Sequence, residues 1–183
     1  NGLGKEERGK EIESYSGLYR EIFKEPPRGF RAPSHLIDNE GISLLQEKGF
    51  LYDSSVVPHY PPFKKYRGFK GRAPLFPYHP SLQNYRQKGE MPILEIPVSG
   101  QILGIPLAGA WLGRLPFLFY QSLFKAVCPG FITLNMHSWD VLDFPGRKAP
   151  AAVFLKKLDK IISLLKEKNY IFLNGEQIFK NNR

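Results

Sequence analysis

The segment FLYDSS (residues 50–55) is a short apolar run that ends in a polar cluster beginning at Asp53. Two other segments follow the same pattern: GFRAPS (29–34) leads to Arg31, and FITLNMHSW (131–139) leads to His137. Short apolar runs of this kind are typical of buried strands. In parallel α/β barrels the downstream ends of the strands carry the chemistry, so Arg31, Asp53 and His137 are a candidate active site.

The composition is that of a folded domain. The chain has 183 residues, of which 42% are hydrophobic and 23% are charged, and these fractions exclude wholesale disorder. One domain is expected over residues 1–183, although a full (β/α) barrel typically needs about 250 residues. The single cysteine, Cys128, excludes an internal disulfide framework, and we expect it to be a small buried side chain.

Neither a leader nor a membrane span is indicated. No basic and then apolar segment follows Asn1, so no signal peptide is visible and the compartment stays open. The uncharged stretch 96–113 is interrupted by Pro97 and Pro106. These breaks favour a buried strand, loop and helix over a transmembrane segment.

Strands and helices alternate along the chain. Apolar residues at helical spacing predict helices at 5–24, 110–127 and 150–168, and Asp38 and Gly49 bound a further helix. The section 57–91 is rich in proline and aromatic residues and is expected to be a long ordered loop. Five strands are expected, at 29–31, 50–52, 93–98, 131–137 and 170–174.

This alternation implies a parallel sheet, because parallel neighbours need crossover connections. An open doubly wound sheet is one solution. However, no glycine-rich phosphate loop follows any strand, so the usual sequence motif for nucleotide binding is missing. The pattern therefore favours a barrel or a partial barrel.

Five short motifs occur in order along these elements: GFRAPS, LLQEKGF, LYDSSV, LEIPVS and NMHSWD. Together they resemble the second half of the polysaccharide deacetylase family, the NodB-homology carbohydrate esterases, from about Arg28 to Phe179. The resemblance implies a distorted (β/α)7 barrel. It also implies hydrolysis of N-acetyl or O-acetyl groups on polysaccharide with a divalent metal, commonly zinc.

Two parts of the family pattern are missing. One is an aspartate pair that supplies the general base and a metal ligand, and the other is an HxxxH pair of metal ligands. The four histidines are 24, 20 and 58 residues apart, so no such pair exists here. Because the helix at 5–24 resembles the one that follows HxxxH, we expect the chain to begin after that motif. The expected fold is an incomplete (β/α)7 barrel of about five parallel strands with flanking helices and no metal ligands.

The resemblance also implies roles for the strand-end residues. Arg31 matches the arginine that holds the general-base aspartate. Asp53 matches the residue that orients the catalytic histidine, and His137 matches that histidine, the general acid. The backbone N–H of Ser34 matches an oxyanion donor. Structural roles stay open beside these: an ion pair for Arg31, a turn or helix cap for Asp53, and a hydrogen-bonded core residue for His137.

Substrate contacts are less clearly marked. The family usually has leucine where Asn135 stands, which leaves Leu134 or Met136 as candidates to line the acetyl pocket. Trp139 offers an indole face for a sugar ring, and core packing is the other interpretation. Glu95 lies opposite Leu94 and Ile96 on its strand, and we expect it to face solvent rather than a barrel mouth.

The net charge is +9, and the segment KKYRGFKGR (64–72) interleaves basic and aromatic residues. Such segments can hold single-stranded nucleic acid or another anionic polymer. We expect a solvated loop instead. The basic residues concerned are Lys64, Lys65, Arg67, Lys70 and Arg72.

The sequence thus predicts the C-terminal part of a metal-dependent polysaccharide deacetylase, inactive as an isolated chain. Its substrate would be an N-acetylated polysaccharide or glycolipid. Two other hypotheses stay open: a catalytically dead carbohydrate-binding relative, and a module that binds nucleic acid or another anionic polymer through residues 64–72.

Overall fold

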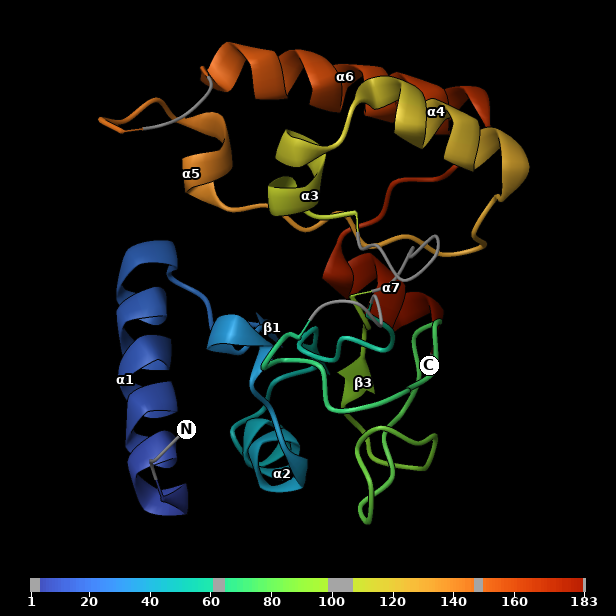
Figure 1. Ribbon diagram of the computed structural model, residues 1–183. Helices are drawn as coiled ribbons and strands as arrows, with labels where there is room; N and C mark the ends of the chain where they lie inside the picture. Colours follow the sequence, from blue (N-terminus) through green and yellow to red (C-terminus); the bar gives the residue numbers. More distant parts are fainter. Residues whose placement is uncertain (1–3, 61–64, 99–106, 147–149, 183) are drawn as a thin grey trace. The chain divides into compact units, whose positions relative to one another are not determined.

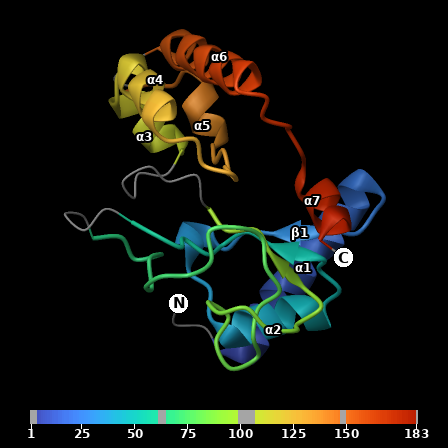
Figure 2. The ribbon, with the colours of Figure 1, turned by 90° about the vertical axis from the view of Figure 1, so that its right-hand side faces the viewer.

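The computed structural model describes residues 4–60, 65–98, 107–146 and 150–182. The chain forms two compact units (Figures 1 and 2). Unit 1 comprises Asn1–His59, Phe63–Val98 and Leu173–Arg183, and unit 2 comprises Tyr60–Pro62 and Ser99–Phe172. This division does not test the expectation of a single deacetylase-type domain, which stays a prediction.

Unit 1 is built on a parallel sheet of three short strands in the order β1-β2-β3. The strands are β1 (Gly29–Phe30), β2 (Tyr52–Asp53) and β3 (Leu94–Glu95). The unit also contains α1 (Lys5–Phe23), the 3-10 turn η1 (Pro33–His35), α2 (Asn39–Glu47) and α7 (Gly175–Asn181).

Helix α2 begins and ends where the sequence predicts. The side chain of Asp38 accepts a hydrogen bond from the backbone N–H of Gly41 at 2.7 Å, which satisfies one of the unpaired donors of the first turn. Gly49 has a φ of +82°, a left-handed conformation that suits glycine after a helix. Between these caps, Ile42, Leu44 and Leu45 turn into the core of unit 1.

Helices α1 and α2 lie side by side in both views (Figures 1 and 2). Ion pairs join them: Arg8 binds Asp38 at 2.9 Å and also Glu40, and Lys48 binds Glu13. Helix α1 buries only Gly9 and Ile12, so these polar contacts and a narrow apolar strip position it.

Unit 2 is helical. It contains α3 (Gly109–Arg114), α4 (Phe117–Ala126), α5 (Ser138–Val141) and α6 (Ala151–Glu167), and α6 packs against the other three. The core of unit 2 consists of Leu107, Leu112, Tyr120, Phe124, Phe154, Ile161, Leu164 and Leu165. The predicted helix at 150–168 is therefore confirmed, with its apolar face buried as its periodicity requires.

The predicted helix at 110–127 is broken. Pro116 disfavours a helical conformation at Leu115, whose ψ is 142°, and α3 and α4 form on either side of this pair. Cys128, expected to be buried, is exposed because it lies just beyond the end of α4.

Two of the five expected strands are absent from the described residues. Segment 131–137 is extended but makes a single parallel bridge, Asn135 to Ala108, and segment 170–174 forms no strand. Strand formation needs a neighbour as well as an apolar run, and Ile171 stays 83% exposed. The expected partial barrel is thus confirmed only as an α/β fold with a parallel sheet.

The section 57–91 contains no helix or named strand in its described part, as predicted. The loop packs around the buried Arg86, whose guanidinium donates to the carbonyls of Val57 (2.8 Å), Gly71 and Arg72 (3.4 Å). Tyr78 forms an antiparallel bridge with Glu95, so this loop covers the outer edge of β3. The sequence of this loop does not distinguish the buried Arg86 from the exposed basic residues of the same loop.

Candidate active site at the strand ends of unit 1

Parallel strands bring their downstream ends to one edge of the sheet. In register, Phe30 of β1 faces Asp53 of β2, and Asp53 faces Glu95 of β3. Neighbouring strands lie about 4.8 Å apart, so Asp53 and Glu95 are adjacent. Both side chains are fully buried. Arg31 follows β1 at the same edge of the sheet.

Asp53 is held by its own turn. Its Oδ1 accepts from the hydroxyl of Ser55 at 2.8 Å, and its Oδ2 accepts from the Ser55 backbone N–H at 3.0 Å. Burial raises the pKa of Asp53, while hydrogen bonds from Glu95 and Ser55 act in the opposite direction. These two bonds within a turn are the structural role that the sequence left open for Asp53. They do not exclude the catalytic role, which stays a prediction.

Glu95 was expected to face solvent, and that prediction is wrong. Its side chain is completely buried, and its Oε1 accepts from the backbone N–H of Val56 at 3.0 Å. Its Oε2 accepts no hydrogen bond from a described residue. Burial first, and then the charge of Asp53, raise the pKa of Glu95 well above its usual range. Strand alternation alone could not reveal this burial, because the loop residue Tyr78 covers β3.

Arg31 binds Ser54, the residue that follows β2. Its Nε donates to the Ser54 carbonyl at 2.8 Å and its Nη2 donates to the Ser54 hydroxyl at 2.7 Å. That hydroxyl donates onward to the carbonyl of Ile96 at 2.7 Å. Burial lowers the pKa of Arg31, and the charges of Asp53 and Glu95 oppose that shift, so the guanidinium stays charged.

Ser34 lies in η1, just beyond β1. It has a φ of +54°, and its neighbour His35 has a φ of +57°, although neither is glycine. Such conformations cost roughly 1–3 kcal/mol each and gather at functional sites. As the second residue of η1, Ser34 has a backbone N–H of the kind that a helix start leaves without an intrahelical partner. The motif GFRAPS gives no indication of these left-handed backbone conformations.

His137 belongs to unit 2, where it caps α5. Its ring is exposed and stacks on Trp139, with centroids 4.0 Å apart and planes at 17°. Its backbone N–H donates to Oδ2 of Asp140 at 2.8 Å. Trp139 is 56% exposed, so it is not a core residue of this unit. The pairing of His137 with Asp53, which lies in unit 1, stays a prediction.

The residues before His137 pack into unit 2. Leu134 is half-buried against the core, and Asn135 is buried. The backbone of Asn135 bonds Leu107 and Gly109. Leu134 as part of an acetyl pocket also stays a prediction.

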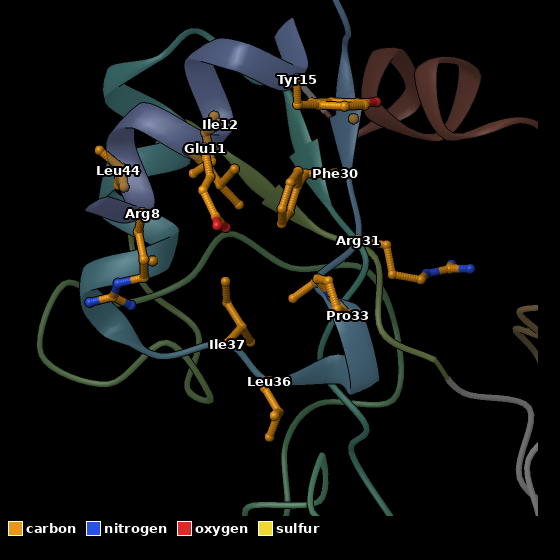
Figure 3. A pocket seen from close by; sticks show the side chains of 14 residues that line it. Arg8, Glu11, Ile12, Tyr15, Phe30, Arg31, Pro33, Leu36, Ile37 and Leu44 are labelled. Atoms are coloured by element: carbon orange, nitrogen blue, oxygen red, sulfur yellow. The ribbon is translucent and has the colours of Figure 1, made fainter. Parts of the chain in front are cut away.

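A cavity of about 510 Å³ lies in unit 1 among α1, β1, η1 and α2 (Figure 3). Ile12, Phe30, Ile37 and Leu44 give it apolar walls, and the side chain of Arg31 points away from it (Figure 3). Arg31 is nevertheless one of the residues that line the cavity.

The basic segment is exposed at each of its described basic residues, Lys65, Arg67, Lys70 and Arg72, and Lys64 lies outside the described residues. In the ranges that the structure describes, three or more His, Cys, Asp or Glu side chains nowhere gather to hold a metal ion. In the same ranges, no helix is long and apolar enough to cross a membrane.

Comparison with known proteins gives two matches. A 33-residue segment is 61% identical to the peptidoglycan deacetylase-like protein FGM2 of Gibberella zeae and covers 18% of this chain and 10% of that protein. The fold matches a Mycobacterium smegmatis protein assigned to the polysaccharide deacetylases, with a TM-score of 0.53 and 18% identity.

The structural match covers 87% of this chain and 51% of the Mycobacterium smegmatis chain, so the chain spans about half the length of that protein. The matched segment spans a tenth of FGM2. No family model matches the sequence. The sequence match is thus to a short segment of a deacetylase-like protein, and the structural match shows a shared α/β fold.

Proposed function

We propose that this chain is the C-terminal part of a metal-dependent polysaccharide deacetylase and contributes an incomplete (β/α)7 barrel to it. The reaction is hydrolysis of an acetamide on an N-acetylated polysaccharide or glycolipid, which yields acetate and a free amine. The observation that carries this proposal is that Arg31 and Asp53 lie together at the strand ends of a fold shared with a polysaccharide deacetylase.

Each candidate residue has a defined task in this reaction. His137 donates a proton to the nitrogen of the leaving amine, and Asp53 orients its imidazolium. Arg31 holds the carboxylate that acts as general base, a task for which its charged guanidinium is suited. The backbone N–H of Ser34 donates to the oxyanion of the tetrahedral intermediate. Trp139 presents an exposed face to a sugar ring, and Leu134 contributes to the wall for the acetyl methyl group.

The metal implied by the resemblance would polarise the acetamide carbonyl and activate water. The ranges that the structure describes contain no cluster of three such donors. We therefore expect the purified 183-residue chain to release no acetate. Stoichiometric zinc together with acetate release from that chain would contradict this expectation.

The decisive experiment measures acetate released from N-acetylated chito-oligosaccharide and from peptidoglycan. The protein tested is this chain together with any residues that its gene encodes before Asn1. We expect His137→Ala to lower kcat by about 10²–10⁴-fold, the usual contribution of a general acid. The matched control is His59→Ala, because His59 lies in unit 1 and has no role in the proposed reaction. An equal loss in both variants would contradict the assignment of His137.

Binding measurements separate the closest rival. If the longer protein binds chito-oligosaccharide without releasing acetate, the chain is a catalytically dead carbohydrate-binding relative. Trp139→Ala should weaken binding in either case, since stacking on an exposed indole needs no catalysis.

A further inference from the structure

Glu95 has no task in the proposed reaction, yet it is fully buried beside Asp53. Two adjacent buried carboxyl groups do not both ionise, because each negative charge disfavours the other and neither is solvated by water. The pair therefore keeps a proton to a higher pH than two separate, solvated carboxyl groups would. The question is which residue carries it.

The hydrogen bonds distinguish the two residues. Asp53 receives two donors from Ser55, at 2.8 and 3.0 Å, one on each oxygen. Glu95 receives one, from Val56 to Oε1, and Oε2 receives none from the described residues. A carboxylate is stabilised by the donors that it accepts, so the negative charge belongs on Asp53. A buried Oε2 without a donor is satisfied when it carries the proton itself.

The surrounding groups are compatible with this division. Arg31 is the nearby cation, and its charge acts on both carboxyl groups. Tyr78, which pairs with Glu95 through its backbone, donates its hydroxyl to the Tyr85 carbonyl at 2.8 Å, so this hydroxyl is already committed. Glu95, the residue paired with Asp53 on β3, is then in place to donate its acid proton to Asp53.

We propose that Glu95 is a positioning residue whose carboxylic acid donates a hydrogen bond to Asp53 and keeps Asp53 the ionised, oriented member of the pair. The strand register β2–β3 builds this contact into the sheet. The consequence for catalysis, that an ionised Asp53 is ready to orient His137, rests on the proposed function. The protonation pattern itself does not.

The test uses the 183-residue chain labelled with ¹³C at the glutamate Cδ and aspartate Cγ carbons. At pH 7 we expect one glutamate carboxyl signal at a protonated chemical shift, absent from Glu95→Gln, and an ionised signal for Asp53, assigned by its loss in Asp53→Asn. A protonated Asp53, or two ionised carboxylates, would overturn the proposal.

The glutamine variant is also a structural test. Its amide can donate to Asp53 and accept from Val56, as the acid does, whereas Glu95→Met offers neither bond. Glu95→Gln should therefore fold and rescue what Glu95→Met loses. A glutamine variant that fails to fold would count against the proposal.

Activity gives an independent readout in the longer protein. Glu95→Met should lower kcat by roughly 10²-fold, the effect of a displaced catalytic group, and leave KM nearly unchanged. Glu95→Gln should recover most of that loss. If the longer protein releases no acetate at all, the proposed function fails while the labelled spectra still decide the state of Glu95. If acetate is released but Glu95 is ionised, only the present inference fails.

Discussion

Asp53 and Glu95 show how burial decides what a carboxyl group does. In the sequence Asp53 ends an apolar run and Glu95 lies within one, and only Asp53 matches a position with a catalytic role in the family. In the structure they are neighbours with different hydrogen-bond partners. The number of hydrogen bonds that each carboxyl group accepts, more than the residue type, decides which of the two is ionised and which is neutral.

This difference predicts a pH dependence of stability. Because the folded-state pKa of Glu95 is raised, the folded chain holds a proton that the unfolded chain releases above about pH 4.3. The stabilisation is complete below that pH and falls by about 1.4 kcal/mol per pH unit until the folded pKa is passed. Asp53, Arg31 and Tyr78 are the titratable groups around it.

Urea unfolding at several values between about pH 5 and 8 measures this slope. We expect the free energy of unfolding of the native chain to fall relative to that of Glu95→Gln, which has no such proton. Parallel curves for the two proteins across this range would show that Glu95 is not protonated in the folded state.

Arg31 is the second residue at which geometry predicts an outcome. Its guanidinium makes two bonds to Ser54, and a lysine ammonium has no matching fork. Arg31→Lys should lower the free energy of unfolding by about 1 kcal/mol, since the site is only partly buried. Arg67→Lys, an exposed substitution in the loop, is the matched control and should change it by less than about 0.5 kcal/mol. Equal effects would mean that the bonds to Ser54 contribute nothing to stability.

At the scale of elements, a lysine ties two helices of unit 2 together. Lys157 of α6 donates to the carbonyls of Leu112 (2.6 Å) and Leu115 (2.8 Å), which the end of α3 leaves without helical partners. Lys157→Met should therefore lower the free energy of unfolding by about 1–2 kcal/mol.

Lys156→Met provides the control for this change, because Lys156 is an exposed neighbour on the same helix. Tryptophan fluorescence is a suitable probe, since Trp111 and Trp139 both belong to unit 2. If the free energy of unfolding falls as much in the Lys156 variant as in the Lys157 variant, Lys157 does not stabilise the end of α3.

Helix α7 depends on a glycine. Asn174 and Gln177 cap it reciprocally, and a Cβ on Gly175 would lie 2.4 Å from the ring of Tyr52. A Cβ on Gly29 would lie 2.1 Å from the same ring, so the ring is packed closely between the two glycines. Gly175→Ala should thus cost about 1–3 kcal/mol and expose the C-terminal residues to limited proteolysis. Gly113→Ala, with open space at its Cβ, should stabilise α3 by up to about 1 kcal/mol. An intact C-terminus in the Gly175 variant would contradict the close packing on Tyr52.

The net charge of +9 acts at the scale of the whole molecule. We expect binding of an anionic glycan or single-stranded oligonucleotide to be weak and to fall with salt, because it reflects total charge. Replacing Lys65, Arg67, Lys70 and Arg72 by glutamine should weaken it no more than replacing Lys125, Lys156, Lys166 and Lys168. A much larger loss from the first set, measured at fixed salt, would instead favour a polymer-binding loop at 65–72.

Local signals were enough for part of the fold. Helical periodicity predicted the helices at 5–24 and 150–168, and Asp38 and Gly49 bounded α2, because caps and periodicity depend on neighbouring residues. The break between α3 and α4 also has a local cause, Pro116. The apolar pattern continues across this proline, and for that reason a single helix was predicted. The segments 131–137 and 170–174 were predicted as strands because an apolar run says nothing about a pairing partner.

The sequence by itself determined the order of the strand-end motifs, the relation to the polysaccharide deacetylases that they suggested, and the candidate roles of Arg31, Asp53 and His137. These rest on residue types and their spacing, which a linear chain retains. The tertiary structure alone decided that Glu95 is buried, that it adjoins Asp53, and that Arg31 binds Ser54. Strand register and desolvation arise only when distant segments meet, and they set which carboxyl group keeps its proton.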